Sequence, residues 1–157
     1  MKVLMVAPGY VIHAQRPLHW LLEKGCNVTF VDWANSNPMT ENRDNYKYLQ
    51  FPSPRGSRFY GIIGKKVANW TAFWTQVLQL CFLKRQINPD ITHIHWVDHR
   101  AYKCVKAGIS PLVLSVWGSD INQFFFQNIN GDKCRLIGET LAAADTVIVD
   151  ALDMIEK

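Results

Sequence analysis

Three imidazoles and one carboxylate lie within a stretch of seven residues, the densest group of reactive side chains in the chain. They are His93, His95, Asp98 and His99. The residues Ile91–Trp96 are a candidate strand, on which His93 and His95 face the same side. We expect His95 to lie near the end of that strand, where it can meet a ligand, and His93 to pack within the sheet.

A metal site is one interpretation of this group. Its order, His-x-His-x-x-Asp-His, is close to the His-x-His-x-Asp-His pattern of metallo-β-lactamase-like hydrolases. One residue too many precedes Asp98, and no histidine follows position 99. Because a metal site needs a defined number and geometry of ligands, we expect no metal here, and a metallohydrolase is the least favoured function.

A loop follows the first apolar run and leads into a helix. It spans Pro8–His13, and Gly9 is its single glycine, so it matches neither Gly-x-Gly-x-x-Gly nor a phosphate-binding P-loop. Backbone N–H groups at the amino end of a helix still favour an anion such as a phosphate, and His13 there can donate to an oxyanion. The alternative is an ordinary tight turn, with His13 as a cap.

The turn Trp117–Asp120 follows the most hydrophobic run of the chain. Gly118 permits a tight turn or the close approach of a ligand, and Ser119 or Asp120 can cap the helix that follows. A helix-capping turn is therefore the alternative to a binding site. The expected position beside His95 favours binding.

Strands and helices alternate along the chain and position these turns. Uninterrupted apolar runs are typical of parallel strands covered on both faces, and apolar residues at intervals of three and four indicate helices. The predicted strands are Lys2–Ala7, Asn27–Asp32, Tyr46–Phe51, Ile91–Trp96, Leu112–Trp117 and Thr146–Val149, and the predicted helices are Ala14–Lys24, Lys65–Gln86, His99–Ala107 and Asp132–Ala144, with another from about Ala151. We therefore expect an α/β fold, Rossmann-like, with a mostly parallel sheet and helices on both faces.

Ligands of such open sheets bind beyond the carboxyl ends of the strands, at the point where the strand order reverses. This rule selects the turns Pro8–His13, His95–His99 and Trp117–Asp120, together with Asp150. We expect the turns near positions 9, 96 and 118 to converge on one edge of the sheet and to leave a hollow there.

Length and composition narrow the class of protein. The chain has 157 residues, 48% of them hydrophobic and 19% charged, which fits a single domain over 1–157 with a substantial core. The net charge of +4 falls short of the dense positive surface of a nucleic-acid binder but suits anionic substrates or lipids. Four separated cysteines, and only about five apolar residues before Pro8, predict a reducing compartment and no signal peptide, hence the cytoplasm.

The predicted helix Lys65–Gln86 is rich in aromatic residues, and basic residues precede it. A basic aromatic stretch can lie on an anionic membrane surface, which would make this a peripheral protein at the inner face of the membrane. We favour the simpler interpretation, in which the helix covers the sheet and Trp70, Phe73 and Trp74 belong to the core.

Five segments, in order along the chain, carry a resemblance to the amino-terminal half of a GT-B glycosyltransferase of the group 1 (GT4) family. MKVLMVAPG at the start is similar to the family's first strand and loop, and RPLHWLLEKGCNVTFV from Arg16 is similar to its first helix and second strand. PDITHIHW from Pro89 resembles its PD-(I/V)-(I/V)-H-x-H strand. PLVLSVWGSD from Pro111 and AADTVIV from Ala143 resemble its P-x-V-x-T-x-H-G-S-D and AD-x-V-I segments.

The resemblance implies two Rossmann-like halves that face a cleft, and a reaction that retains the anomeric configuration without a metal or a cofactor. The carboxyl-terminal half, which we expect this chain to lack, binds most of a nucleotide-sugar donor. The amino-terminal half supplies the pocket for a carbohydrate or lipid-linked acceptor. The implied site residues are Gly9 at the donor phosphate, His95 and Asp98 at the acceptor, and Gly118, Ser119 and Asp120 near the transferred sugar.

Two features depart from the family's pattern. Many members have a histidine where Trp117 stands, and because an indole does not titrate, stacking on a sugar is the expected substitute. The first loop also lacks the double glycine common in the family. Without the paired glutamates of the carboxyl-terminal half, we expect this domain alone to transfer no sugar. The alternative is a non-catalytic Rossmann-like subunit that docks on a catalytic partner or a membrane.

Overall fold

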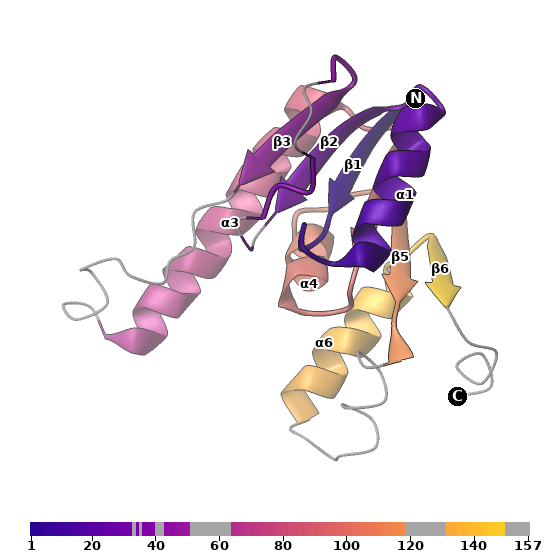
Figure 1. Ribbon diagram of the computed structural model, residues 1–157. Coiled ribbons are helices and arrows are strands. Elements are labelled where there is room, and N and C mark those ends of the chain that lie inside the picture. The colour runs from indigo at the N-terminus through magenta and orange to yellow at the C-terminus, as the bar shows by residue number, and fades with distance from the viewer. Residues whose placement is uncertain (33, 35, 40–42, 51–63, 119–130, 150–157) are drawn as a thin grey trace.

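The structure of the chain is a computed structural model that describes residues 1–32, 34, 36–39, 43–50, 64–118 and 131–149 (Figure 1). Six strands and four helices lie within these residues. The helix expected from about Ala151 and the site residue Asp150 lie outside the described residues.

The strands form one sheet in the order β3-β2-β1-β4-β5-β6, and every neighbouring pair is parallel. They are β1 (Lys2–Val6), β2 (Asn27–Asp32), β3 (Tyr46–Gln50), β4 (Ile91–His95), β5 (Leu112–Val116) and β6 (Thr146–Val149). The prediction of a Rossmann-like, mostly parallel sheet is confirmed. The strand order reverses between β1 and β4, because the chain runs outward to β3 on one side and to β6 on the other.

Helices cover both faces of the sheet, as predicted. They are α1 (Ile12–Glu23), α3 (Lys65–Ile87), α4 (His99–Lys106) and α6 (Gly131–Ala142). α1 lies on one face, and α3, α4 and α6 lie on the other (Figure 1). Side chains of β1 alternate between the two cores, because Leu4 and Val6 pack with α3, α4 and α6 whereas Val3 and Met5 pack with α1.

The outer side of α3 differs from its prediction. Phe73 packs against the core as expected, but the side chains of Trp70 and Trp74 are 64% and 41% exposed. Their assignment to the core was wrong, because the face of α3 that meets the sheet is already filled by residues such as Val77 and Leu80. Among the described residues, no helix is both long enough and apolar enough to cross a bilayer.

Candidate functional site

The turns after β1, β4 and β5 meet at the carboxyl edge of the sheet. The ring of His13, in the first turn of α1, lies 4.2 Å from the ring of Trp117, which follows β5. The ring of His95, the last residue of β4, lies 6.5 Å from the same indole. The structure thus brings together three residues that the sequence analysis selected in three distant segments.

His95 is the most buried member of this cluster, with 5% of its surface exposed. No group among the described residues pairs with either ring nitrogen, although buried polar side chains nearly always have a hydrogen-bond partner. Burial, with the neighbouring His93 and His13, lowers the pKa of His95 to about 3. The ring is therefore neutral at pH 7 and offers one donor and one acceptor.

His93 and Ser115 lie next to His95. Nε2 of His93 lies 2.8 Å from Oγ of Ser115, and the rings of His93 and His95 are 4.2 Å apart. Burial lowers the pKa of His93 to about 4, so this ring is neutral as well. Ser115 could not be predicted as a neighbour of His93 from sequence, because its place depends on the register between β4 and β5, which no local pattern reveals.

Trp117 and Gly118 are half-buried at the end of β5. The indole plane is inclined by 37° to the ring of His13 and by 19° to the ring of His95, so aromatic faces dominate this side of the cluster. Ser119 and Asp120 lie outside the described residues, and their roles stay predictions.

Gly9, in the loop after β1, is enclosed by the chain itself. A Cβ at this position would lie 1.7 Å from the backbone oxygen of Ser36 and 2.9 Å from Cδ of Pro38. The N–H of Gly9 donates to Oδ1 of Asp32 at 3.4 Å. A glycine is needed here because Ser36 leaves no room for a side chain, a reason that is independent of any donor phosphate.

Asp32, at the end of β2, is a buried carboxylate that the sequence analysis did not single out. It is fully buried and accepts hydrogen bonds from the N–H of Ala34 (2.7 Å), the N–H and Oγ of Ser36, and the hydroxyl of Tyr48 (3.1 Å). Burial and the nearby carboxylate raise the pKa of Tyr48 to about 12. These contacts fix the loop that carries Gly9.

Position alone could have drawn attention to Asp32. In dinucleotide-binding Rossmann folds, an acidic residue near the end of the second strand binds the ribose hydroxyls. Here donors of the chain itself surround the carboxylate. Asp32 is therefore an internal anchor of the loops rather than a group open to a ligand.

Asp98 is the N-cap of α4. Oδ1 accepts the backbone N–H of Arg100 at 2.7 Å, and Oδ2 lies 2.9 Å from Nε of the same arginine. Both oxygens stabilise the start of the helix and point to Arg100, not to the imidazoles of the cluster. With Val97 and His99, Asp98 also lines a cavity of about 250 Å³ against α6, so it borders a hollow on the α6 side of the sheet.

Trp96 has a backbone conformation that bulky residues rarely adopt. Its φ is 92°, which costs about 1–3 kcal/mol. Its N–H donates to the carbonyl of Ser115 at 3.1 Å and so holds the turn against β5. The predicted strand therefore ends one residue early, at His95, and the strained turn after it lies between His95 and Asp98, as is typical of functional sites.

The described geometry gives no support to a metallohydrolase. Within the described ranges, no three His, Cys, Asp or Glu side chains are placed to hold one ion. His93 and His95 are neighbours, but His99 lies 3.7 Å from Asp98, whose carboxylate is paired with Arg100.

A family model described as glycosyl transferase 4-like matches residues 2–151. The match covers nearly the whole chain, and the chain belongs to this family. The resemblance found in the five sequence segments is therefore confirmed. No curated protein matches the chain.

Among solved structures, the chain is similar to the Bordetella bronchiseptica enzyme WbmH in complex with NAD+. The sequences are 10% identical, and the superposition has a TM-score of 0.56 over 94% of this chain and 55% of WbmH. At this identity the likeness shows the fold alone. The chain spans about half the length of that protein.

Proposed function

We propose that the chain is the amino-terminal half of a retaining glycosyltransferase, which moves a sugar from a nucleotide-diphosphate donor to a carbohydrate or lipid-linked acceptor. The family match over residues 2–151 supports the transferase class. A carboxyl-terminal GT-B half holds the donor and completes the cleft, so the domain alone is inactive. The intact enzyme works in the cytoplasm without a metal. It contacts the membrane peripherally.

The observation that carries the proposed site is the pair of ring nitrogens on buried His95, neither of which has a partner in the part of the chain that the structure describes. A sugar hydroxyl can both donate and accept a hydrogen bond, and a neutral imidazole offers the complementary pair of atoms. An acceptor hydroxyl that bonds to His95 would satisfy a group that is otherwise buried without a partner. We therefore propose that His95 orients the acceptor hydroxyl.

His13, Trp117 and Gly118 complete the acceptor side. The paired rings of His13 and Trp117 provide a surface on which the apolar face of a sugar packs. Gly118 presents no side chain, so its backbone allows the sugar to approach closely. The intact enzyme would act by positioning the hydroxyl and by stabilising the departing diphosphate electrostatically.

Saccharide binding to the 157-residue chain tests the site. We expect mono- and disaccharides to bind weakly by saturation-transfer NMR, and His95→Ala to weaken that binding about tenfold, because one or two hydrogen bonds are lost. The matched control is His19→Ala, which removes an exposed imidazole of α1 and should leave binding unchanged.

Turnover tests the claim that the domain is incomplete. We expect no release of nucleoside diphosphate when the 157-residue chain is mixed with nucleotide-diphosphate sugars and saccharide acceptors. Measurable sugar transfer by this chain would contradict the proposed division of labour between two halves. Equal losses of binding in His95→Ala and His19→Ala would contradict the assigned acceptor site.

The second candidate is a non-catalytic Rossmann-like subunit that docks on a catalytic partner or a membrane. The exposed apolar side of α3 favours this docking subunit, because Trp70 and Trp74 there are exposed and not packed into the core. The saccharide titration separates the two candidates, since a subunit used only for docking would bind no sugar at the His95 cluster.

A further inference from the structure

α3 has two apolar sides, and the sheet uses one of them. The inner side packs Val77, Leu80 and Leu83 into the core. The outer side carries a row of large exposed side chains, called here the outer stripe: Val67 (51%), Trp70 (64%), Trp74 (41%), Leu78 (66%) and Phe82 (63%).

The outer stripe is a continuous band along the helix. Its members follow one another at intervals of three and four residues, which at 3.6 residues per turn confines them to about a third of the circumference. An ordinary surface helix carries charged and polar residues on this side. A helix that is apolar on both sides is expected to have a second apolar environment.

The charges on α3 indicate what that environment is. The 23 residues of the helix contain Lys65, Lys66, Lys84 and Arg85 and no acidic residue. The basic residues stand at the two ends of the helix and the apolar band lies between them. This arrangement is complementary to a surface with anionic groups above an apolar layer.

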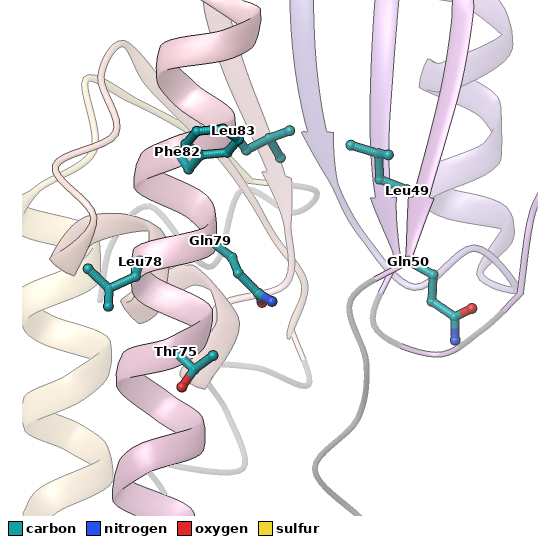
Figure 2. A pocket seen from close by; sticks show the side chains of 7 residues that line it. All are labelled: Leu49, Gln50, Thr75, Leu78, Gln79, Phe82 and Leu83. Carbon is teal, nitrogen blue, oxygen red and sulfur yellow. The ribbon is translucent and has the colours of Figure 1, made fainter.

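The apolar surface continues from the outer stripe toward the edge of the sheet. Leu78 and Phe82 also line a groove of about 480 Å³, whose far side is formed by Leu49 and Gln50 at the end of β3 (Figure 2). None of the described residues that line this groove is charged. It widens the apolar contact area beyond the helix and lies at the end of β3, on the carboxyl edge of the sheet.

We propose that the outer stripe of α3 binds the surface of an anionic lipid bilayer, with the helix lying in the plane of the interface. The indoles of Trp70 and Trp74 would sit at the level of the lipid headgroups, where tryptophan is enriched, and Leu78 and Phe82 would reach the acyl chains. Lys66 and Arg85, near the two ends of the helix, would meet anionic headgroups, whereas the ammonium of Lys84 donates to the carbonyl of Gly108. The proposal rests on the peripheral membrane contact of the proposed function and assigns it to one surface, and its test does not require sugar transfer.

The orientation of α3 relates the proposed membrane contact to the His95 cluster. The amino-terminal half of the helix extends beyond the carboxyl ends of the strands (Figure 1). The amino-terminal part of the outer stripe therefore lies at the end of the domain that carries the His95 cluster, and the rest of the stripe runs back along the sheet. That placement suits an acceptor carried by a lipid.

Vesicle co-sedimentation of the 157-residue chain tests the proposal. We expect the chain to sediment with vesicles of phosphatidylcholine and phosphatidylglycerol, to stay in solution with phosphatidylcholine alone, and to be released by high salt. Trp70→Glu and Leu78→Glu should each weaken binding about tenfold or more, because each places a carboxylate in the interface.

Trp20→Glu is the matched control. Trp20 is also an exposed tryptophan, with 57% of its surface exposed, but it lies on α1, which covers the opposite face of the sheet. The same change there should alter vesicle binding less than twofold if the outer stripe makes the contact.

Four results would overturn the proposal. The first is no sedimentation of the wild-type chain with anionic vesicles, which requires no variant to fold. The second is an equal loss in Trp20→Glu. The third is unfolding of both Trp70→Glu and Leu78→Glu by circular dichroism, which would mean that the outer stripe is core. The fourth is a wild-type dimer that Trp70→Glu dissociates and that ignores vesicles, which would make a second copy the occupant. None of these results bears on saccharide binding at His95.

Discussion

Asp32 and His95 are both polar side chains buried at the carboxyl edge of the same sheet, and their surroundings are opposite. Asp32 accepts hydrogen bonds from Gly9, Ala34, Ser36 and Tyr48. His95 has no partner for either ring nitrogen among the described residues. The fold supplies the partners of the first group, and we propose that a ligand supplies those of the second.

The contrast separates stability from function at one edge. A buried group with all its partners stabilises the fold, and removing it leaves several donors unsatisfied. A buried group without partners costs stability and persists where a ligand uses it. Mutations at the two positions should therefore have opposite profiles, with stability affected at Asp32 and binding affected at His95.

The largest effect should come from Asp32→Ala. Loss of the carboxylate leaves the N–H groups and hydroxyls around it without an acceptor, and we expect the free energy of unfolding to fall by about 3 kcal/mol. Urea denaturation followed by circular dichroism measures this. Tyr48→Phe removes one donor of the same set and should cost about 1 kcal/mol. Equal stability of Asp32→Ala and wild type would contradict the claim that Asp32 stabilises the fold.

Gly9→Ala should have the next largest effect. The new Cβ would meet the backbone oxygen of Ser36, and because backbone atoms cannot rotate away, we expect a loss of about 2 kcal/mol. The control is Gly138→Ala in α6, where a Cβ meets nothing within 4 Å and alanine should stabilise the helix by about 1 kcal/mol. A thermal-melting series that ranks the two variants the other way would contradict the packing described for the first loop.

The pH dependence of stability should report the buried histidines. The pKa values of His93 and His95 are lowered from 6.5 to about 4 and about 3 in the folded chain. Below pH 6.5 the unfolded chain therefore binds more protons than the folded chain, and stability falls as the pH falls from 6.5 toward 4.

The slope in this window approaches about 1.4 kcal/mol per pH unit for each histidine. Urea midpoints measured between pH 7 and 4.5 give it directly. His95→Phe should reduce the slope by the contribution of one histidine. His19→Ala, which removes an exposed imidazole, is the control and should leave the slope unchanged. An unchanged slope in His95→Phe would mean that His95 is not held neutral by the fold.

The smallest change in stability should come from His95→Phe itself. Phenylalanine fills a similar volume and carries no unpartnered nitrogen, so we expect the free energy of unfolding at pH 7 to change by less than about 1 kcal/mol. Saccharide binding by saturation-transfer NMR should nevertheless be lost. A variant that loses both properties together would indicate that His95 is a structural residue like Asp32.

The sequence was sufficient to predict the elements because their signals are local. β1, for example, is an apolar run followed by Pro8 and Gly9, and Gly25 ends the next helix in a left-handed conformation (φ 74°). Parallel order and the carboxyl-edge rule then brought His13, His95 and Trp117 to one place. The sequence could not show which side of α3 would face the core, since both of its sides are apolar.

The partners of buried polar groups could not be predicted because they are not local. The donors to Asp32 come from the first loop, the segment after β2 and a residue of β3, and Ser115 reaches His93 from the neighbouring strand. Asp98 lies in the predicted turn, but its oxygens go to Arg100. Only the folded geometry distinguishes a completed polar group from an open one.

The ring nitrogens of His95 provide the most direct test of this account. Proton–nitrogen correlation spectra of the imidazoles, recorded at pH 7 while a saccharide is added, report whether each nitrogen gains a hydrogen bond. We predict that the His95 nitrogen signals shift on addition of the sugar and that those of His19 stay in place. Saturating saccharide that leaves the His95 nitrogens unmoved would contradict the claim that this buried imidazole is kept open for a ligand.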